Sequence, residues 1–434
     1  MSKTKVAVVG AGWAGCTAAV ELARRGHTVT LFESARTLGG RARAVEFNSK
    51  VLDNGQHILL GAYSQALALM QRVGVDTGAA LLRLPLQMRY PPGSGGMDFV
   101  AARLPAPLHV GVALLRASGL TRADKLALAR FNTSARWMDW TLHVDCSVAD
   151  LLERFDQTPN LIRLMWRPLC LAALNTPLET ASARVFLAVL RDSLGARRSA
   201  SDMLLPRRDL GTLFPVAAAS FVERHGGTVR LGVKVASIAR GTGWTVNETE
   251  TFDQLVLATP ASQSAQLLRT VEGGADTAAL LDAFTYEPIV TCYLQYDAAL
   301  RLPLPMYALV DDAAAGHWGQ FVFDRGQLDA SQAGLLAVVV SAAQDATALD
   351  QATLAQAIAT QLATSLQLPA LGQPAWTQVI AEKRATFACT ADLLRPGNDI
   401  GLPGLALAGD YTASDYPATL ESAVRSGIAA AARM

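Results

Sequence analysis

Three glycines close to the start of the chain have the spacing of a pyrophosphate-binding turn. They are Gly10, Gly12 and Gly15. In such a turn the first glycine permits the bend, the second lets backbone approach the phosphates, and the third lets a helix pack closely on a strand. Further along, Glu33 can accept both ribose hydroxyls of an adenosine, whereas its carboxylate would repel the 2′-phosphate of NADP. These residues predict a bound NAD or FAD.

Two later segments favour FAD over NAD. Segment 38–43 has two glycines that expose backbone N–H groups and two arginines that can neutralise a diphosphate, namely Gly39, Gly40, Arg41 and Arg43. Near the other end, Asp410 follows Gly409 and can bind ribityl hydroxyls, and a helix that opens at Thr419 can stabilise the negative edge of a reduced flavin. Because a nicotinamide cofactor needs no such distant second set of contacts, the sequence predicts FAD.

The glycine turn requires a β–α–β unit to hold it. The pattern predicts a strand at 5–9, a helix at 14–25 capped by Gly26, and a second strand at 28–32. The later chain predicts strands at 229–231, 234–238, 245–248, 254–258, 289–296, 320–323, 335–341 and 405–408, and helices at 212–224, at 348–366 and from 419. Between them, 84–200 has a hairpin-like turn at 91–96 and is otherwise mostly helical.

The predicted fold class is α/β, with a Rossmann-like FAD-binding domain similar to that of glutathione reductase and a discontinuous mixed α+β substrate domain. The FAD-binding domain is expected to comprise 1–83, 205–270 and 391–434, and the substrate domain 84–204 and 271–390.

Composition narrows the function classes. The 434 residues are 51% hydrophobic and 17% charged, which allows a large core and an apolar cavity and excludes global disorder. A net charge of +1 gives no case for nucleic acid binding. The five cysteines and six histidines show no metal-ligand or disulfide spacing, so we expect no metal site and a reducing compartment. No apolar stretch is long enough to span a bilayer, and the early glycines argue against a signal peptide, so we predict a cytoplasmic protein.

The motifs together resemble a known superfamily. GAGWAG at 10–15, Glu33, LGGRAR at 38–43, LVLATP at 255–260 and AGDY at 408–411 are similar to the flavin amine oxidase and carotenoid desaturase superfamily. Within it, segments 53–57, 167–177, 201–207 and 416–422 resemble the squalene-associated flavoproteins of the hydroxysqualene dehydroxylase family. The resemblance implies FAD contacts at Gly10, Gly12, Ala14, Gly15, Glu33, Gly39, Gly40, Arg41, Arg43, Gly55, Gln56, His57, Val235, Gly409, Asp410, Thr419 and Leu420.

The resemblance also implies a reaction, the reductive dehydroxylation of hydroxysqualene to squalene with reduced FAD as the hydride donor. The enzyme must help hydroxide to leave an allylic carbon and shield the resulting cation from water. His57 and Asp202 are the candidate general acids, with Asp209 a weaker third. The alternatives are a His57 that only hydrogen-bonds the flavin or backbone, and an Asp202 that caps a helix or stabilises a turn.

A long apolar isoprenoid substrate implies access to a membrane. Segment 103–136 interleaves leucines with basic residues, namely Arg103, Arg116, Arg122, Lys125, Arg130 and Arg136. One interpretation is a helix pair that lies on the inner face of the cytoplasmic membrane. The other is a core-facing helix pair with a solvated basic side. Association with other squalene-pathway enzymes is a further implied partnership.

Two other functions stay open. One is an FAD-dependent desaturase or oxidase of a polyisoprenoid or carotenoid precursor. The other is a non-catalytic isoprenoid carrier on the same fold, against which the intact Glu33, 39–43 and 409–410 sets argue.

Overall fold

The computed structural model describes residues 4–434, so the first three residues of the predicted FAD-binding segment 1–83 lie outside it. Its first layer is a five-stranded sheet in which every neighbouring pair of strands is parallel, in the order β10-β2-β1-β14-β20. The strands are β1 (Lys5–Val9), β2 (Thr28–Glu33), β10 (Thr228–Leu231), β14 (Gln254–Leu257) and β20 (Leu405–Leu407). The central strand is a run of apolar residues because both faces of this sheet are buried.

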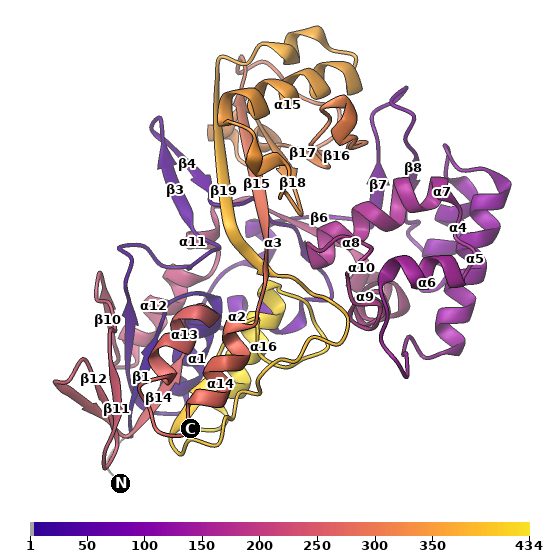
Figure 1. Ribbon diagram of the computed structural model, residues 1–434. Coiled ribbons are helices and arrows are strands. Elements are labelled where there is room, and N and C mark those ends of the chain that lie inside the picture. The colour runs from indigo at the N-terminus through magenta and orange to yellow at the C-terminus, as the bar shows by residue number, and fades with distance from the viewer. Residues whose placement is uncertain (1–3) are drawn as a thin grey trace.

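Helices cover this sheet at the lower left of Figure 1. They are α1 (Trp13–Arg24), α2 (Ser64–Arg72), α3 (Thr77–Ala80), α11 (Leu210–Leu213), α12 (Pro215–Arg224), α13 (Ala261–Leu268), α14 (Ala275–Asp282) and α16 (Leu420–Ala431). Helix α1 packs against α12 and α16. The α1–α16 contact is close because Gly427 has no side chain: a Cβ there would lie 2.4 Å from the carbonyl oxygen of Ala14. A small antiparallel sheet lies beside them, formed by β11 (Ile238–Arg240), β12 (Trp244–Val246) and β13 (Glu250–Phe252).

The second layer is an antiparallel sheet at the top of Figure 1, in the order β16-β17-β18-β15-β19. It comprises β15 (Tyr286–Gln295), β16 (Met306–Ala308), β17 (Phe321–Asp324), β18 (Leu335–Val340) and β19 (Trp376–Phe387). Its side chains alternate between two cores: Leu336 and Val338 pack toward α15 (Gln351–Ser365), whereas Ala337 and Val339 join the core on the opposite face. The sheet therefore offers one apolar face to the rest of the molecule.

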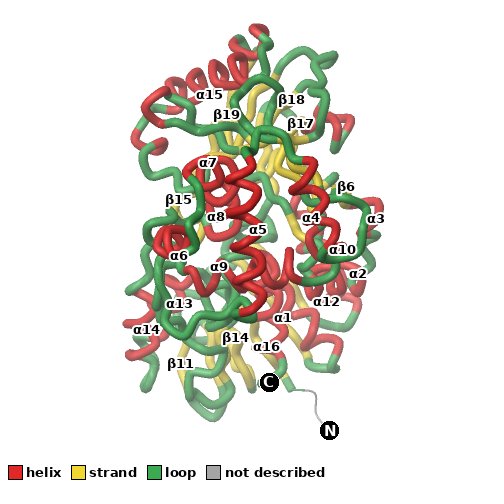
Figure 2. The backbone as a smooth tube through the Cα atoms, turned by 90° about the vertical axis from the view of Figure 1, so that its right-hand side faces the viewer, coloured by secondary structure: helices red, strands yellow, loops and turns green. Residues whose placement is uncertain are grey.

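The third unit is helical and lies at the right of Figure 1 and toward the viewer in Figure 2. It contains α4 (Leu108–Arg116), α5 (Arg122–Trp137), α6 (Val148–Arg154), α7 (Pro159–Leu161), α8 (Arg167–Leu174), α9 (Ala183–Leu190) and α10 (Arg198–Ser201), with π-helical turns η1 (Ile162–Trp166) and η2 (Arg191–Gly195). The remaining strands are short and form three small antiparallel sheets: β3 (Ala44–Phe47) with β4 (Lys50–Asp53); β5 (Leu59–Leu60), β9 (Met203–Pro206) and β6 (Leu81–Leu84); and β7 (Gln87–Arg89) with β8 (Asp98–Val100). Among residues 4–434, no helix is both long and apolar enough to cross a bilayer.

The predicted α/β fold class is confirmed, and two predicted elements are wrong. Segment 234–238 is not a strand, because Gly232 turns the chain at φ +71° and the Asn247 side chain bonds the backbone that a strand partner would use. Asn247 accepts from the Ala236 N–H at 2.8 Å and donates to the Lys234 carbonyl at 3.0 Å. The predicted helix 212–224 is broken between α11 and α12, where Pro215 begins the second helix.

Candidate cofactor and active site

A cavity of about 690 Å³ lies where the three units meet. That volume is in the range of small-molecule and cofactor sites. One end is lined by residues one or two positions after the parallel strands β1, β14 and β20, namely Gly10, Ala258 and Gly409. Ligands of open α/β sheets bind at this carboxyl edge, so the cavity is placed where a dinucleotide would be expected.

Two glycine loops face each other at this end and leave a cradle without side chains. Gly10 has a φ of +102°, and a Cβ there would lie 2.6 Å from the Ala258 carbonyl oxygen. Gly39 donates its N–H to the Ala11 carbonyl at 2.9 Å, and a Cβ on Gly40 would lie 3.1 Å from the Cα of Gly12. Only glycines permit this approach, which leaves backbone N–H groups free to meet phosphate oxygens.

The N-terminus of α1 points its free N–H groups toward the same cradle. Its N-cap, Gly12, has no side chain to bond them, and no acidic residue stands in the first turn. Such a helix end favours an anion. Ala14 lines the cavity here, but Gly15 does not: a Cβ on Gly15 would lie 1.8 Å from the Gly10 carbonyl oxygen, so its role is to let the helix pack on the turn.

Glu33 lies at the end of β2 and lines the cavity. Its Oε2 accepts from the N–H of Ala11 at 2.8 Å, and its Oε1 accepts from the N–H of Ala35 at 2.9 Å. The carboxylate therefore fixes the glycine turn to the neighbouring strand and still presents acceptors to the cavity. Val235 lines the same end, in the irregular segment that the sequence had predicted as a strand.

The residues near the two ends of the chain meet across the cavity. Nη2 of Arg41 lies 2.7 Å from both carboxylate oxygens of Asp410, and Nη1 donates to the Ala385 carbonyl at 2.6 Å. The sequence predicted separate contacts of these two residues with a diphosphate and with ribityl hydroxyls, whereas the structure pairs them. Arg43 also lines the cavity and donates to the Gly40 carbonyl at 2.7 Å.

Helix α16 presents its first turn to the cavity. Thr419 is its N-cap and accepts from the Ser422 N–H at 3.1 Å, while Leu420 lines the cavity beside it. The acidic residue of this turn, Glu421, also lines the cavity, but its carboxylate accepts from the N–H groups of Gln65 and Ala66 and pairs with Arg425. The positive end of the helix therefore faces the cavity.

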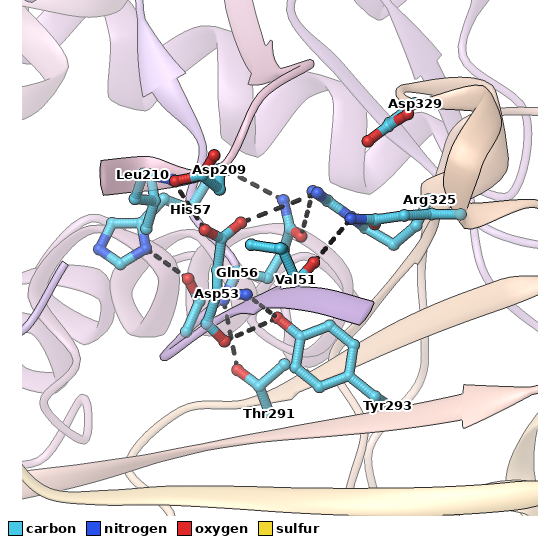
Figure 3. A network of polar contacts seen from close by, with 12 residues as sticks. Val51, Asp53, Gln56, His57, Asp209, Leu210, Thr291, Tyr293, Arg325 and Asp329 are labelled. Carbon is cyan, nitrogen blue, oxygen red and sulfur yellow. Dashed lines mark hydrogen bonds and ion pairs between the residues drawn. The ribbon is translucent and has the colours of Figure 1, made fainter. Parts of the chain in front are cut away.

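Segment 53–57 crosses the middle of the cavity wall and is held by the antiparallel sheet. The Tyr293 hydroxyl donates to the Asp53 carbonyl at 2.9 Å and accepts from the Asp53 N–H at 3.2 Å. The Thr291 hydroxyl accepts from the Gln56 N–H at 3.3 Å. Figure 3 shows both side chains reaching this segment from β15. The antiparallel sheet therefore fixes the position of Gly55, Gln56 and His57, all of which line the cavity.

A buried cation completes this anchorage (Figure 3). Arg325 is only 2% exposed, and it donates to Oε1 of Gln56 at 2.9 Å and to Oε1 of Gln332 at 2.8 Å. Its Nη2 lies 3.8 Å from Oδ2 of Asp53. Burial raises the pKa of Asp53 to about 6, although Arg325 and the Leu210 N–H act in the opposite direction. Nothing in the local sequence around Arg325 indicated this role, because its partners are far away in the chain.

His57 lies in the cavity wall and is partly buried. Its Nδ1 is 2.7 Å from the Gly55 carbonyl oxygen, which assigns the proton to Nδ1 and leaves Nε2 as an acceptor. Burial lowers the pKa of His57 below its ordinary value, so the ring is neutral near pH 7. A neutral ring with this tautomer holds no proton on Nε2. Its geometry fits a hydrogen-bonding group better than a general acid.

The structure does not bring Asp202 or Asp209 to the cavity. Asp202 is buried and forms an ion pair with Arg83 at 2.9 Å, while its neighbours Ser201 and Met203 line the cavity. Asp209 caps α11 by accepting from the Thr212 N–H at 2.9 Å. Asp209 therefore has a capping contact, whereas Asp202 has an ion pair and not the helix-cap or turn contact that the alternative expected of it.

Beyond segment 53–57 the cavity becomes an apolar arm. Its walls come from η1 and α8 of the helical unit, from the open face of the antiparallel sheet, and from the β7–β8 hairpin; they include Met165, Leu169, Ala172, Phe321, Phe323, Val339, Met88 and Phe99. A polar pair also lines this region: the Tyr416 hydroxyl donates to Asp192, which lies in η2. Burial alone would raise the pKa of Asp192, but hydrogen bonds from Arg191 and Tyr416 bring it below the ordinary value. Sequence reasoning missed this pair because neither residue stands in a catalytic motif.

Comparisons with known proteins agree with this geometry. The family model of flavin containing amine oxidoreductases matches residues 13–434. A hydroxysqualene dehydroxylase from Rhodopseudomonas palustris is 29% identical over 99% of this chain and 98% of its own. Another from Sinorhizobium fredii is 27% identical over 98% of this chain and 97% of its own. A zeta-carotene desaturase from Zea mays is 33% identical over 43% of this chain and 35% of its own. The structure of cyclohexylamine oxidase from Brevibacterium oxydans superposes on this chain with a TM-score of 0.67. The superposition covers 99% of this chain and 98% of the oxidase at 16% sequence identity, so the two proteins share a fold.

Proposed function

The chain belongs to the family of flavin-containing amine oxidoreductases, and from that membership we propose that it binds FAD and reduces hydroxysqualene to squalene. One observation carries the proposal: a single cavity runs from a glycine-lined phosphate cradle to an apolar arm. The cradle fits a dinucleotide, and the arm fits a long hydrocarbon chain. The near full-length similarity to hydroxysqualene dehydroxylases supports the choice of that hydrocarbon.

The donor set of the cradle fits FAD. The backbone of the two glycine loops and the N-terminus of α1 would hold the pyrophosphate, and Glu33 would bind the adenosine ribose. Asp410, with Arg41 beside it, and the N-terminus of α16 would hold the ribityl and pyrimidine end. Reduced FAD in this place would supply the hydride that replaces the hydroxyl of the substrate.

Departure of the hydroxyl as water would take up one proton in addition to the hydride, and the residues around the apolar arm would protect the resulting cation by excluding water. Met165, Phe321 and Phe323 present only apolar atoms, so an allylic cation formed there would meet no solvent nucleophile. His57 would hold the substrate hydroxyl by accepting its hydrogen at Nε2. The ordered wall that Tyr293 and Thr291 build behind segment 53–57 would keep this ring in place.

The second candidate is an FAD-dependent desaturase of a polyisoprenoid, which the similarity to a carotene desaturase favours over part of the chain. It would use the same cavity in the opposite redox direction. A carrier that binds isoprenoids without FAD has less support, because such a protein has no need of the glycine cradle or of Glu33.

The test is anaerobic incubation of the purified protein with reduced FAD and hydroxysqualene, with squalene measured by mass spectrometry. A parallel sample carries Glu33→Arg, which should lose squalene formation together with bound flavin. Squalene that appears with wild type as the flavin becomes oxidised supports the proposal. A flavin-loaded wild type that forms no squalene, but dehydrogenates a polyene precursor when FAD is oxidised, would establish the desaturase instead.

Residence beside other squalene-pathway enzymes in the cytoplasm belongs to the same proposal, because hydroxysqualene must be made by one enzyme and squalene consumed by another. Co-purification of the natively expressed chain with such enzymes is the measurement that bears on it.

A further inference from the structure

The outer surface of the helical unit carries apolar side chains that pack against nothing. The relative exposures of Trp137, Leu115 and Leu126 are 87%, 76% and 64%. Six of the eleven exposed large apolar residues of the described chain lie between 104 and 144, namely Leu104, Leu108, Leu115, Leu126, Trp137 and Val144. A cluster of this kind marks an interaction surface rather than ordinary surface composition.

Helix α5 shows that this exposure follows the helical repeat. Its buried residues Asp124, Ala127, Leu128, Phe131 and Ala135 form one face. On the opposite face, Arg122, Leu126, Arg130 and Trp137 recur at spacings that keep them in one stripe. The stripe thus alternates cations with apolar side chains. Helix α4 adds Leu108 and Leu115, one heptad apart, on its own exposed side.

The basic residues of this surface are free of acidic partners. Within residues 4–434, no carboxylate lies within ion-pair distance of Arg103, Arg116, Arg122, Lys125, Arg130 or Arg136. The nearby acid Asp124 is buried and accepts hydrogen bonds from Thr158 and Asn160, so it faces inward. Lys125 bends back to donate to the Leu115 carbonyl at 2.9 Å, which joins α5 to the end of α4. The surface therefore presents uncompensated positive charge around exposed leucines.

Both views place α4 and α5 side by side on the outside of the molecule: at the right edge in Figure 1 and toward the viewer in Figure 2. On its inner side, α5 packs Phe131 against Trp166, with ring centroids 4.6 Å apart. The residue before Trp166 is Met165, which lines the apolar arm. Through Phe131, Trp166 and the η1 turn, α5 thus packs against the wall of the cavity.

We propose that the α4–α5 surface docks the protein on an anionic lipid bilayer, with Leu115, Leu126 and Trp137 in the interfacial region and the arginines on lipid phosphates. Alternating cations and apolar side chains are typical of helices that lie in a membrane interface. A second copy of the chain fits less well, because a two-fold contact through this surface would oppose arginines to arginines. The inference rests on the proposed function only for the purpose of docking, which is to give a water-insoluble substrate access to the apolar arm of the cavity.

Co-sedimentation with vesicles tests the docking directly. Full-length, FAD-loaded protein is mixed with vesicles of equal parts phosphatidylglycerol and phosphatidylcholine, and separately with phosphatidylcholine alone. We expect binding to the anionic vesicles that weakens as salt is raised. Arg122→Gln/Arg130→Gln should bind about thirtyfold more weakly, since each basic side chain near an anionic surface contributes roughly a fivefold gain in affinity. The charge-matched control Arg208→Gln/Arg240→Gln, at exposed sites elsewhere, should bind like wild type.

The apolar half of the proposal has its own variant. Leu115→Glu/Leu126→Glu should abolish vesicle binding, whereas the control Leu368→Glu/Leu394→Glu, also at exposed leucines, should not. Both doubles should keep the wild-type circular dichroism spectrum. The proposal would be overturned if the wild type bound neutral and anionic vesicles equally well, or if the control variants lost as much vesicle binding as the test variants. It would also be overturned if the wild type were a dimer that Leu115→Glu/Leu126→Glu dissociates.

A separate assay distinguishes this inference from the proposed reaction. Hydroxysqualene dispersed in detergent does not need a bilayer, so Leu115→Glu/Leu126→Glu should form squalene from it at the wild-type rate. Vesicle-borne hydroxysqualene should be converted much more slowly by that variant. Loss of both activities would refute a role restricted to docking, while a wild type that binds vesicles but forms no squalene would refute only the proposed reaction.

Discussion

Replacing Arg325 with methionine should destabilise the protein in a pH-dependent way. The guanidinium is buried between Gln56, Gln332 and Asp53 and joins the antiparallel sheet to the segment that lines the cavity. Methionine has a similar length and no hydrogen-bond donor. The variant therefore keeps most of the packing and removes the charge together with its hydrogen bonds.

The size of the loss follows from what is left behind. The two glutamine oxygens lose a charged donor, and a buried acceptor without a partner costs about 1–3 kcal/mol. Asp53 adds less than an ordinary buried carboxylate, because its pKa is already about 6 in the wild type. Protonating it at pH 7 costs at most about 1.4 kcal/mol. We expect a total loss of about 4 kcal/mol at pH 7, within the range for a broken buried pair.

The pH dependence separates the free energy lost with the hydrogen bonds from the free energy lost through the Asp53 carboxylate. The folded-state pKa of Asp53 lies above its ordinary value of 3.8, so the wild-type free energy of unfolding falls as the pH rises from about 4 to about 6. Without Arg325 this pKa rises further, and the fall continues above pH 6. At pH 5 the carboxyl is protonated in both proteins, so the difference between them should be about 1.4 kcal/mol smaller than at pH 7.

Urea unfolding of the apoprotein at pH 5 and pH 7 measures both quantities. Arg301→Met, at an exposed arginine, is the control and should change the unfolding free energy by no more than about 0.5 kcal/mol. In an Asp53→Asn background the Arg325→Met loss should become independent of pH. This account of the network would be refuted if Arg325→Met lowered the unfolding free energy by less than about 1 kcal/mol. It would also be refuted if the loss were equal at both pH values in the protein that retains Asp53.

Three further predictions concern the cavity. Glu33→Arg should weaken FAD binding at least about a hundredfold, since two hydrogen bonds to a charged acceptor are lost. A fluorescence titration of the apoprotein with FAD measures the dissociation constant. An unchanged dissociation constant would remove Glu33 from the site. His57→Ala should keep the flavin absorbance and slow turnover, and full activity would end its proposed role in holding the substrate hydroxyl. Asp202→Asn should leave turnover unchanged, because the Asp202 carboxylate pairs with Arg83 outside the cavity; a loss as large as that of His57→Ala would restore it as a catalytic candidate.

The sequence predicted the parallel sheet well because its information is local. Apolar runs, the glycine turn and Gly26 place β1, α1 and β2 within a residue or two of the structure. Segment 234–238 was mispredicted because Asn247, which holds its backbone, is distant in sequence and shows no pattern in common with it. The break before Pro215 could have been found, since proline favours the first turn of a helix.

The glycine-lined end of the cavity was also foreseeable, because phosphate cradles need glycines at fixed spacing. The long-range contacts that hold the rest of the cavity wall were not. Arg325 reaches Gln56, 269 positions away, through a fold that no local motif encodes. The same holds for Asp192 and Tyr416, 224 positions apart. The ion pair of Asp202 with Arg83, 119 positions away, is likewise a contact that no local motif indicates.

The strand order of the parallel sheet has a consequence for synthesis of the chain. Strand β1 is central, yet its partner β14 arrives late: the contact between Lys5 and Asp253 joins residues 248 positions apart. The Arg41–Asp410 pair joins residues 369 positions apart. While the ribosome is still making the middle of the chain, β1 and β2 therefore have an unpaired edge, and the cradle cannot close. We expect the nascent chain to depend on chaperones during this interval and flavin to bind only after β20 has joined the sheet.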